Sequence, residues 1–204
     1  MDILFIHPNG AVAVYQSLAK DHSAIEPPIW AAMLANSVRS REFNTSILDA
    51  EAERLTINEV ADKIVDADAR VICFVVYGQQ PSASSQNMVG ACETAKLLKE
   101  KAPSSFILFV GGHVSALPKE TLESEYYIDA VCQNEGVYTI CDLLQVEDLN
   151  NDYYLNNVKG LGYRNKSGEI TLTPPSPIVK NDNLENDLPG MAWDLLPDYH
   201  KYRT

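Results

Sequence analysis

Small and polar residues that can bind a ligand follow four of the apolar runs in the sequence, at the point where each run ends. Side chains with little bulk let a large ligand approach the backbone, and hydroxyl, amide and imidazole groups give it hydrogen bonds. The candidate binding residues are His7, Pro8, Asn9, Gly10, Tyr77, Gly78, Gln79, Gln80, Ser82, Ser84, Gly111, Gly112, His113, Ser115, Asn134, Glu135 and Gly136. Any one of these loops is explained by an ordinary turn or helix cap. Their recurrence favours a ligand site.

Common nucleotide and catalytic motifs do not match these loops. A dinucleotide site needs Gly-x-Gly-x-x-Gly after the first strand, where Gly10 stands alone. Asp49 could bind a ribose but has no glycine loop beside it, and a P-loop is absent. A phospho-receiver needs an aspartate where Tyr77 stands. No nucleophile, base and acid can be grouped with any specificity, so we assign no catalytic residue.

The cysteines give little support to a metal or cluster site. They stand at positions 73, 92, 132 and 141, and none forms a Cys-x-x-Cys pair. Zinc and iron–sulfur sites use closely spaced cysteines. We expect reduced, buried thiols that pack as small hydrophobic groups, and no metal ligand in this chain.

Short apolar runs alternate with helical patterns along the first 146 residues. The predicted strands cover residues 3–6, 45–48, 71–76, 106–110 and 128–131. The predicted helices cover residues 28–41, 57–66, 84–101, 119–124 and 136–145. Five such units predict an α/β fold with a doubly wound, flavodoxin- or Rossmann-like sheet of five parallel strands. In such sheets ligands bind beyond the carboxyl ends of the strands, where the candidate loops lie.

The pattern changes after about residue 146. Residues 161–164 and 169–172 flank a glycine-bearing turn and predict a β-hairpin. A proline-rich stretch and an acidic, Asn-rich stretch follow, and then a proline-broken tail that carries Trp193, Tyr199 and Tyr202. We interpret that tail as a strap whose aromatic residues pack against another surface. The chain is therefore divided into a binding domain, 1–146, and a hairpin with a linker strap, 147–204.

Charge and hydropathy restrict the partners. Of the 204 residues, 46% are hydrophobic and the net charge is −12, which argues against nucleic acids and anionic membranes as partners. No apolar stretch approaches the roughly 20 residues that span a bilayer, and the N-terminus does not resemble a signal peptide. We expect a cytoplasmic protein.

Several segments together resemble the N-terminal cobalamin-binding domain of B12-dependent radical S-adenosylmethionine enzymes. They are the Pro27-Pro28 entry to the first helix, ILDAEAERL (47–55), FVGGHVSALP (109–118), NEGVYTI (134–140), GLGYRNKSGEITLTPP (160–175) and DLPGMAWDLLPDYHKYR (187–203). The last segment resembles the linker that leads into the radical domain of that family. The family has Gly-Glu-Gly at the fifth strand end, and Asn134 departs from it.

The resemblance implies cobalamin as the cofactor, with its nucleotide tail in a channel between the sheet and its helices. Gly111 and Gly112 would make room for the tail, and Gly78, Ser82, Ala83 and Ser115 would leave space and offer hydroxyl groups. It also implies a C-terminal radical domain in cis, which would hold S-adenosylmethionine and a [4Fe-4S] cluster. The cluster motif Cys-x-x-x-Cys-x-x-Cys is absent from this sequence, so the chain is expected to bind but not to catalyse on its own.

His7 is the one plausible cobalt ligand, and the sequence argues against that role. Cobalamin proteins with a histidine below cobalt carry Asp-x-His-x-x-Gly, whereas this sequence has Phe5-Ile6-His7-Pro8-Asn9-Gly10. The missing aspartate would orient the imidazole and raise its basicity. We therefore expect His7 to line the pocket without ligating cobalt.

Two other functions remain open. One is a cofactor-free flavodoxin-like module that binds a partner through its aromatic tail. The other is a transferase half-domain that holds a sugar nucleotide at the same loops. Retention of a corrin absorption band identifies the cobalamin protein, and affinity for a nucleoside diphosphate identifies the half-domain.

Overall fold

A computed structural model describes residues 1–9, 24–78 and 81–202 of the chain. Gly10, Gln79 and Gln80 of the predicted site lie outside these residues, as does the side chain of Ser82.

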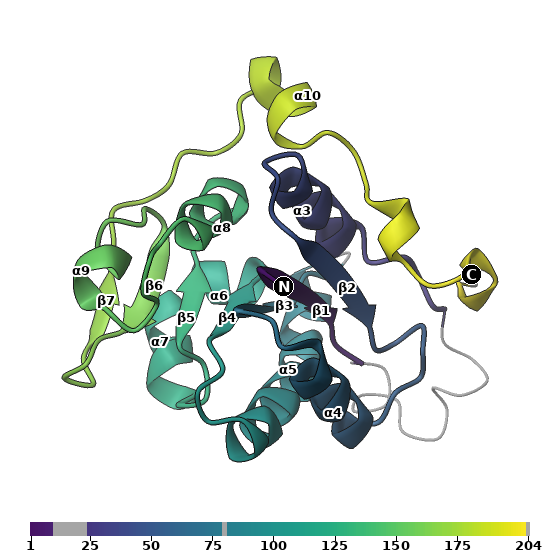
Figure 1. Cartoon of the computed structure of the whole chain (residues 1–204), viewed down its shortest axis with the longest axis horizontal. Helices are drawn as coiled ribbons and strands as arrows, with labels where there is room; N and C mark the ends of the chain where they lie inside the picture. Colours follow the sequence, from purple (N-terminus) through teal and green to yellow (C-terminus); the bar gives the residue numbers. More distant parts are fainter. Residues whose placement is uncertain (10–23, 79–80, 203–204) are drawn as a thin grey trace.

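One continuous sheet organises the described chain (Figure 1). Its strands are β1 (Ile3–His7), β2 (Thr45–Asp49), β3 (Val71–Val75), β4 (Ile107–Val110), β5 (Ala130–Cys132), β6 (Leu161–Arg164) and β7 (Ile170–Leu172). The order is β2-β1-β3-β4-β5-β6-β7, with β1 to β5 parallel. The predicted doubly wound α/β fold is confirmed, and the order of its first five strands is flavodoxin-like.

The predicted count of five strands is wrong, because the hairpin extends the same sheet. β6 pairs antiparallel with β5, setting Cys132 opposite Leu161, and β7 pairs antiparallel with β6. β5 would otherwise leave a row of backbone groups unpaired at the sheet edge. Pairing with β6 satisfies those groups and buries Leu161 and Tyr163. The division at residue 146 stays a prediction.

Helices cover both faces of the sheet (Figure 1). They are α3 (Ile29–Arg39), α4 (Ile57–Ala67), α5 (Pro81–Lys101), α6 (Gly112–Ala116), α7 (Pro118–Ser124), α8 (Val137–Leu144), α9 (Asp152–Leu155) and α10 (Leu184–Asp187). α3 and α8 pack on one face, and α4 to α7 pack on the other. The five predicted helices are confirmed within three residues at each end. The short helix α6 was missed, since the stretch 111–118 was expected to be a loop.

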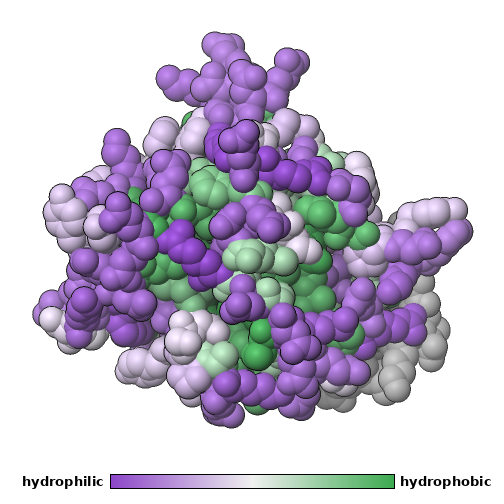
Figure 2. All heavy atoms as spheres, in the orientation of Figure 1, coloured by the Kyte–Doolittle hydropathy of each residue, from purple (hydrophilic) through white to green (hydrophobic). Residues whose placement is uncertain are grey.

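The central strands are buried from both sides, which explains their unbroken apolar runs. All five residues of β3 are buried, and Phe5, Phe74 and Phe109 are among the largest fully buried side chains. Alternate residues of each strand enter separate cores, so that Phe5 packs under α3 while Phe74 and Phe109 pack under α4 and α5. Figure 2 shows one face of the folded chain, where hydrophilic residues dominate the periphery.

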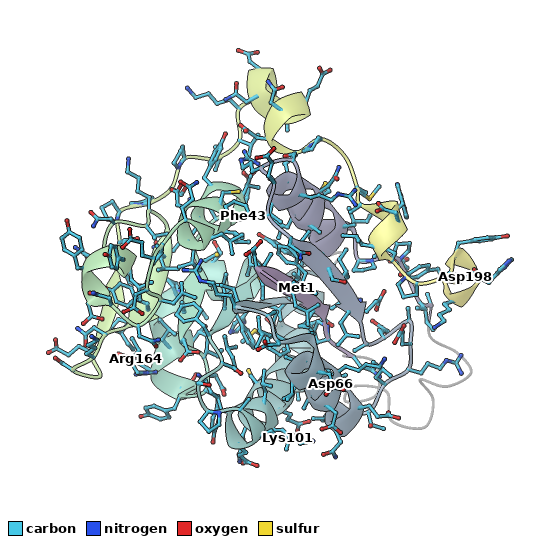
Figure 3. The ribbon with its side chains drawn as sticks, viewed as in Figure 1. Met1, Phe43, Asp66, Lys101, Arg164 and Asp198 are labelled. Atoms are coloured by element: carbon cyan, nitrogen blue, oxygen red, sulfur yellow. The ribbon has the colours of Figure 1, made fainter. Side chains whose placement is uncertain are left out.

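The C-terminal segment, residues 188–202, runs back along α3 toward the end of β2. The Ala192 amide donates to the Ala32 carbonyl at 3.1 Å, and Arg39 makes two hydrogen bonds to Asp194, at 2.6 and 3.0 Å. In Figure 3 Asp198 marks this segment at the right of the view, well away from Met1.

The segment packs mainly through aliphatic residues, and of the three aromatic residues predicted to pack, Tyr202 is partly buried and bonds to Asp49. Leu188, Met191, Leu195 and Leu196 contact the core, whereas Trp193 is 56% exposed and Tyr199 is 74% exposed. Across the described residues, no helix is both long and apolar enough to cross a membrane.

Candidate functional site

The carboxyl ends of β1, β3, β4 and β5 lie at one edge of the sheet, as parallel strands require. β1 and β3 are neighbours, and the chain turns outward in opposite directions from them, toward β2 and toward β4. Such a switch point leaves a crevice at the strand ends in open α/β sheets. The fold therefore brings the four predicted loops to one place.

The two glycines after β4, Gly111 and Gly112, have different surroundings. A Cβ on Gly111 would lie 2.5 Å from the carbonyl oxygen of Val76, so the neighbouring strand leaves no room for one. Among the described residues, a Cβ on Gly112 would meet the side chain of Ser84, with Oγ at 3.3 Å. Gly112 is also exposed at the start of α6. Gly111 is thus explained by the fold alone, whereas a Cβ at Gly112 would contact a side chain and no described backbone atom.

Asn134 connects three of the loops. Its backbone amide donates to Ser115 Oγ at 2.8 Å, its carbonyl accepts from Tyr77 Oη at 3.2 Å, and its Nδ2 donates to the Ser176 carbonyl at 3.1 Å. Its φ of 57° is left-handed, a conformation that asparagine tolerates better than most residues. The departure from glycine at this position therefore keeps the backbone shape and adds a side-chain hydrogen bond.

Serine side chains tie the start of α5 to the neighbouring loops. Ser84 is buried, and its Oγ accepts a hydrogen bond from the Gly78 amide at 2.9 Å. Ser85 Oγ and His113 Nδ1 are 3.1 Å apart. Ser84 and Ser115 both accept backbone amides, which leaves their own hydroxyl protons available as donors.

Tyr77 forms the wall of the site on the α3 side. Its ring stacks on Trp30 at 4.5 Å between centroids and 20° between planes. Burial, with the nearby Cys132 and Glu135, raises the pKa of Tyr77, so its phenol stays protonated and donates to Asn134. Trp30, which stacks on this wall, was not among the predicted site residues.

The remaining predicted residues have structural partners. Pro8 is buried, and Asn9 Nδ2 donates to the Leu55 carbonyl at 3.2 Å. Glu135 Oε2 accepts from the Val179 amide at 3.0 Å. Gly136, with φ of 78°, begins α8, and a Cβ there would lie 2.7 Å from Val110. These residues shape the loops.

His7 lies at the edge of this group and turns toward β2. Its Nδ1 lies 2.9 Å from Asp49 Oδ1, while its Nε2 lies 3.9 Å from Glu51 Oε2. The carboxylate partner missing at position 5 is thus supplied in space by Asp49, which sequence reasoning considered only for a ribose. The pairing register, which places His7 opposite Asp49, is the signal that could have found it.

The His7–Asp49 pair is largely buried, and the pKa shifts of both groups favour its charged form. Burial alone lowers the pKa of His7, but the hydrogen bond to Asp49 and the charges of Asp49 and Glu51 outweigh it and raise that pKa. Burial alone raises the pKa of Asp49, but His7, the Ala52 amide and the Tyr202 hydroxyl outweigh it and lower that pKa. Both shifts favour an imidazolium–carboxylate pair.

The cysteines do not converge on a cluster. Cys73, Cys132 and Cys141 are buried and Cys92 is partly buried, all as free thiols. Among the residues that the structure describes, no three His, Cys, Asp or Glu side chains are placed to hold a metal ion.

Comparison with known families shows which family the chain belongs to. The B12 binding domain family matches residues 7–144, from the end of β1 to the end of α8. The chain belongs to the B12-binding domain family. The matched region includes all seventeen predicted site residues, from His7 to Gly136.

Curated relatives are much longer proteins. An uncharacterized methyltransferase of Pyrococcus horikoshii is 31% identical over 178 residues, 87% of this chain and 36% of that protein. The anaerobic magnesium-protoporphyrin IX monomethyl ester cyclase of Rubrivivax gelatinosus is 25% identical over 197 residues, 95% of this chain and 33% of that protein. The chain thus spans about a third of the length of these relatives.

Solved structures share the fold. The cobalamin-dependent S-adenosylmethionine radical enzyme OxsB, with aqua-cobalamin and S-adenosylmethionine bound, superposes with a TM-score of 0.66 at 18% identity, over 95% of this chain and 24% of that one. The radical S-adenosylmethionine methyltransferase TsrM of Kitasatospora setae gives a TM-score of 0.61 at 15% identity, over 85% of this chain and 30% of that one.

The chain is therefore a B12-binding domain, and cobalamin is its cofactor. The resemblance found in the sequence is confirmed at the level of the family. The roles of individual site residues stay predictions.

Proposed function

We propose that the chain holds cobalamin across the ends of β1, β3, β4 and β5, with the nucleotide tail passing Gly112 toward the face covered by α5. The observation that carries this proposal is the unequal space at the two glycines. A Cβ at Gly111 would lie 2.5 Å from the Val76 carbonyl oxygen, whereas at Gly112 the nearest described group is the hydroxyl of Ser84, a hydrogen-bond donor, at 3.3 Å. The opposite side is closed by the Trp30–Tyr77 stack and by the bond from Tyr77 to Asn134.

The chain's own residues would bind and orient the cofactor. Asn134 and Ser115 fix the loops after β5 and β4 relative to each other, and Gly78 and Ser84 fix the start of α5. Exposed backbone and hydroxyl groups on these loops would serve the amide and phosphate groups of the ligand. Bound cobalamin supplies a cobalt centre that can carry a methyl group or accept an electron.

The wider role is that of one part of a B12-dependent radical S-adenosylmethionine enzyme. A following radical domain, in cis, would hold S-adenosylmethionine and the [4Fe-4S] cluster. The likeness of this chain to about a third of each longer relative supports such an arrangement. The described residues do not fit the cluster themselves, since no set of ligands converges in them.

Incubation with hydroxocobalamin followed by desalting tests the binding. A folded sample should keep a corrin absorption band at roughly one cobalamin per chain. Loss of the band from a folded sample would favour the cofactor-free module. Affinity for a nucleoside diphosphate in place of cobalamin would favour the sugar-nucleotide half-domain.

A further inference from the structure

A buried carboxylate joins three distant parts of the chain at the end of β2. The side chain of Asp49 has no exposed surface. Its Oδ1 accepts from His7 Nδ1 at 2.9 Å and from the Ala52 amide at 3.0 Å, and its Oδ2 accepts from Tyr202 Oη at 2.9 Å. The strand β1, the loop after β2 and the C-terminal segment therefore meet at one group.

The groups that face this carboxylate are mostly acidic. Glu51 lies beside His7, and burial raises the pKa of Glu51, with Glu26 nearby adding to the rise. Glu53 lies near Tyr202 and pairs at 3.8 Å with Lys201 and with Lys63. His7 is thus the cation that compensates Asp49 directly, while the two lysines form only exposed pairs with Glu53, which contribute little.

We propose that Asp49 is a latch that seats residues 199–202 of the C-terminal segment against the ligand edge, and that His7 couples this seating to cobalamin at the strand ends. The inference rests on the proposed function, since it needs a ligand at that edge. His7 Nδ1 is committed to Asp49, and the distance of 3.9 Å from Nε2 to Glu51 exceeds that of a hydrogen bond. Among the described residues Nε2 makes no hydrogen bond, and it is the atom at which a ligand amide, or a water bound to that amide, would contact the imidazole.

The coupling follows because the single carboxylate of Asp49 accepts all three hydrogen bonds. Asp49 divides its negative charge among His7, Ala52 and Tyr202, so a change at His7 alters how strongly the carboxylate holds the tyrosine. Such coupling is reciprocal, because seating the segment must change ligand affinity by the same factor. Binding of cobalamin at the strand ends would therefore change how firmly residues 199–202 are held.

The rest of the segment is fastened independently of the latch. Asn36 donates to the Pro189 and Gly190 carbonyls, Ser37 donates to the Asp187 carbonyl, and Arg39 pairs with Asp194. None of these groups contacts Asp49 or His7. Release of Tyr202 would therefore free only the end of the segment, while residues 187–194 stay on α3.

Hydrogen exchange of a peptide covering residues 196–202, with and without hydroxocobalamin, tests the coupling. In the wild-type chain, the cofactor should change the exchange rate several-fold. Tyr202→Phe keeps the ring but removes the donor, so this response should disappear while cobalamin is still retained. Tyr199→Phe removes the same group from a side chain that is 74% exposed and should behave as the wild type. Retained cobalamin with unchanged exchange would overturn the latch but leave the proposed function intact.

Titration of His7 by NMR tests the shared carboxylate without any cofactor. Tyr202→Phe leaves Asp49 a stronger partner for the imidazolium, so the midpoint of His7 should rise by on the order of half a pH unit. Tyr199→Phe should leave it in place. Equal midpoints in the wild type and Tyr202→Phe would contradict the coupling even where cobalamin does not bind.

Discussion

The carboxyl edge of the sheet has two halves of opposite character. At β1 and β2, His7, Asp49 and Tyr202 form a buried, charged network in which each oxygen of the carboxylate is used. At β3, β4 and β5 the groups are mostly uncharged, Glu135 accepts from the Val179 amide, and Asn134 joins the loops through backbone atoms. The charged half is occupied by the protein itself. In the mostly neutral half, the described group nearest to a Cβ at Gly112 is the Ser84 hydroxyl, at 3.3 Å.

This difference indicates that the two halves of the edge suit different partners, a ligand and a segment of the chain itself. A large, amide-rich ligand needs room and backbone groups, which small residues give. A segment that must be held in one position needs a strong and specific acceptor, which a buried carboxylate gives. Each half can be tested by changes to its own residues.

The largest effect is expected at Gly111, where the neighbouring strand leaves no room for a side chain. Gly111→Ala places a Cβ 2.5 Å from the Val76 carbonyl oxygen, a backbone atom that cannot easily move away. Overpacking of this kind costs about 3 kcal/mol of the free energy of unfolding, measured by urea denaturation. Gly112→Ala, whose Cβ meets only Ser84, should cost less than about 1 kcal/mol. Equal losses would show that the two glycines are not distinguished by space.

The charged half should respond to pH. In Asp49→Asn the buried pair is lost, which should cost about 1–3 kcal/mol of the free energy of unfolding. The lowered pKa of Asp49 adds stability that is lost as pH falls below the unfolded value of 3.8. The raised pKa of His7 adds stability that is complete below its unfolded value of 6.5 and is lost as pH rises through the folded value.

The difference between wild type and Asp49→Asn should therefore be largest between about pH 4 and 6.5. Denaturation curves across this range measure it. Asp62→Asn removes a carboxylate whose side chain is 63% exposed, from a pair with Lys101, and should change little at any pH. A pH-independent difference for Asp49→Asn would contradict the ion pair.

A smaller effect is expected at the connection between loops. Tyr77→Phe removes the hydrogen bond to the Asn134 carbonyl while keeping the stack on Trp30. The loss should be about 0.5–1.5 kcal/mol, with faster amide exchange in residues 133–136. Tyr153→Phe, at a side chain that is 73% exposed, serves as the control. Unchanged exchange in Tyr77→Phe would mean that Asn134 does not depend on this contact.

The smallest effect on cobalamin binding is expected at His7. Its Nδ1 is bonded to Asp49 and its Nε2 lies 3.9 Å from Glu51 Oε2, so we expect it not to ligate cobalt. His7→Ala should then change cobalamin affinity by about 1 kcal/mol, roughly fivefold. The EPR spectrum of bound cob(II)alamin should lack histidine nitrogen coupling. Three-line splitting in the wild type that disappears in His7→Ala would reverse this assignment.

Local patterns were enough to predict the strands and the meeting of the loops. The unbroken apolar run at 71–76 predicted a strand covered on both faces, and β3 is buried throughout. Parallel order then places the strand ends together without further information. Gly112 and Ser115 were predicted in this way, because their type and their position after a strand carry the signal, and the structure places both at the carboxyl edge.

Contacts between distant segments could not be predicted in the same way. His7 and Asp49 are 42 residues apart, and the motif for such a pair places the aspartate two residues before the histidine, at Phe5. The hairpin was predicted, but its pairing with β5 depends on which sheet edge is free. The role of Tyr202 depends on the course of the C-terminal segment along α3, which no periodicity encodes.

Equilibrium dialysis with hydroxocobalamin, on the wild type and on Gly112→Leu, tests the central claim that the neutral half holds the cofactor. An isobutyl group at position 112 would fill the proposed tail path at a cost of about 1–3 kcal/mol, while the fold stays intact by urea denaturation. The account predicts about one cobalamin per wild-type chain and binding weakened several-fold or more in the variant. Unchanged affinity in a folded Gly112→Leu chain would place the tail elsewhere and contradict the account.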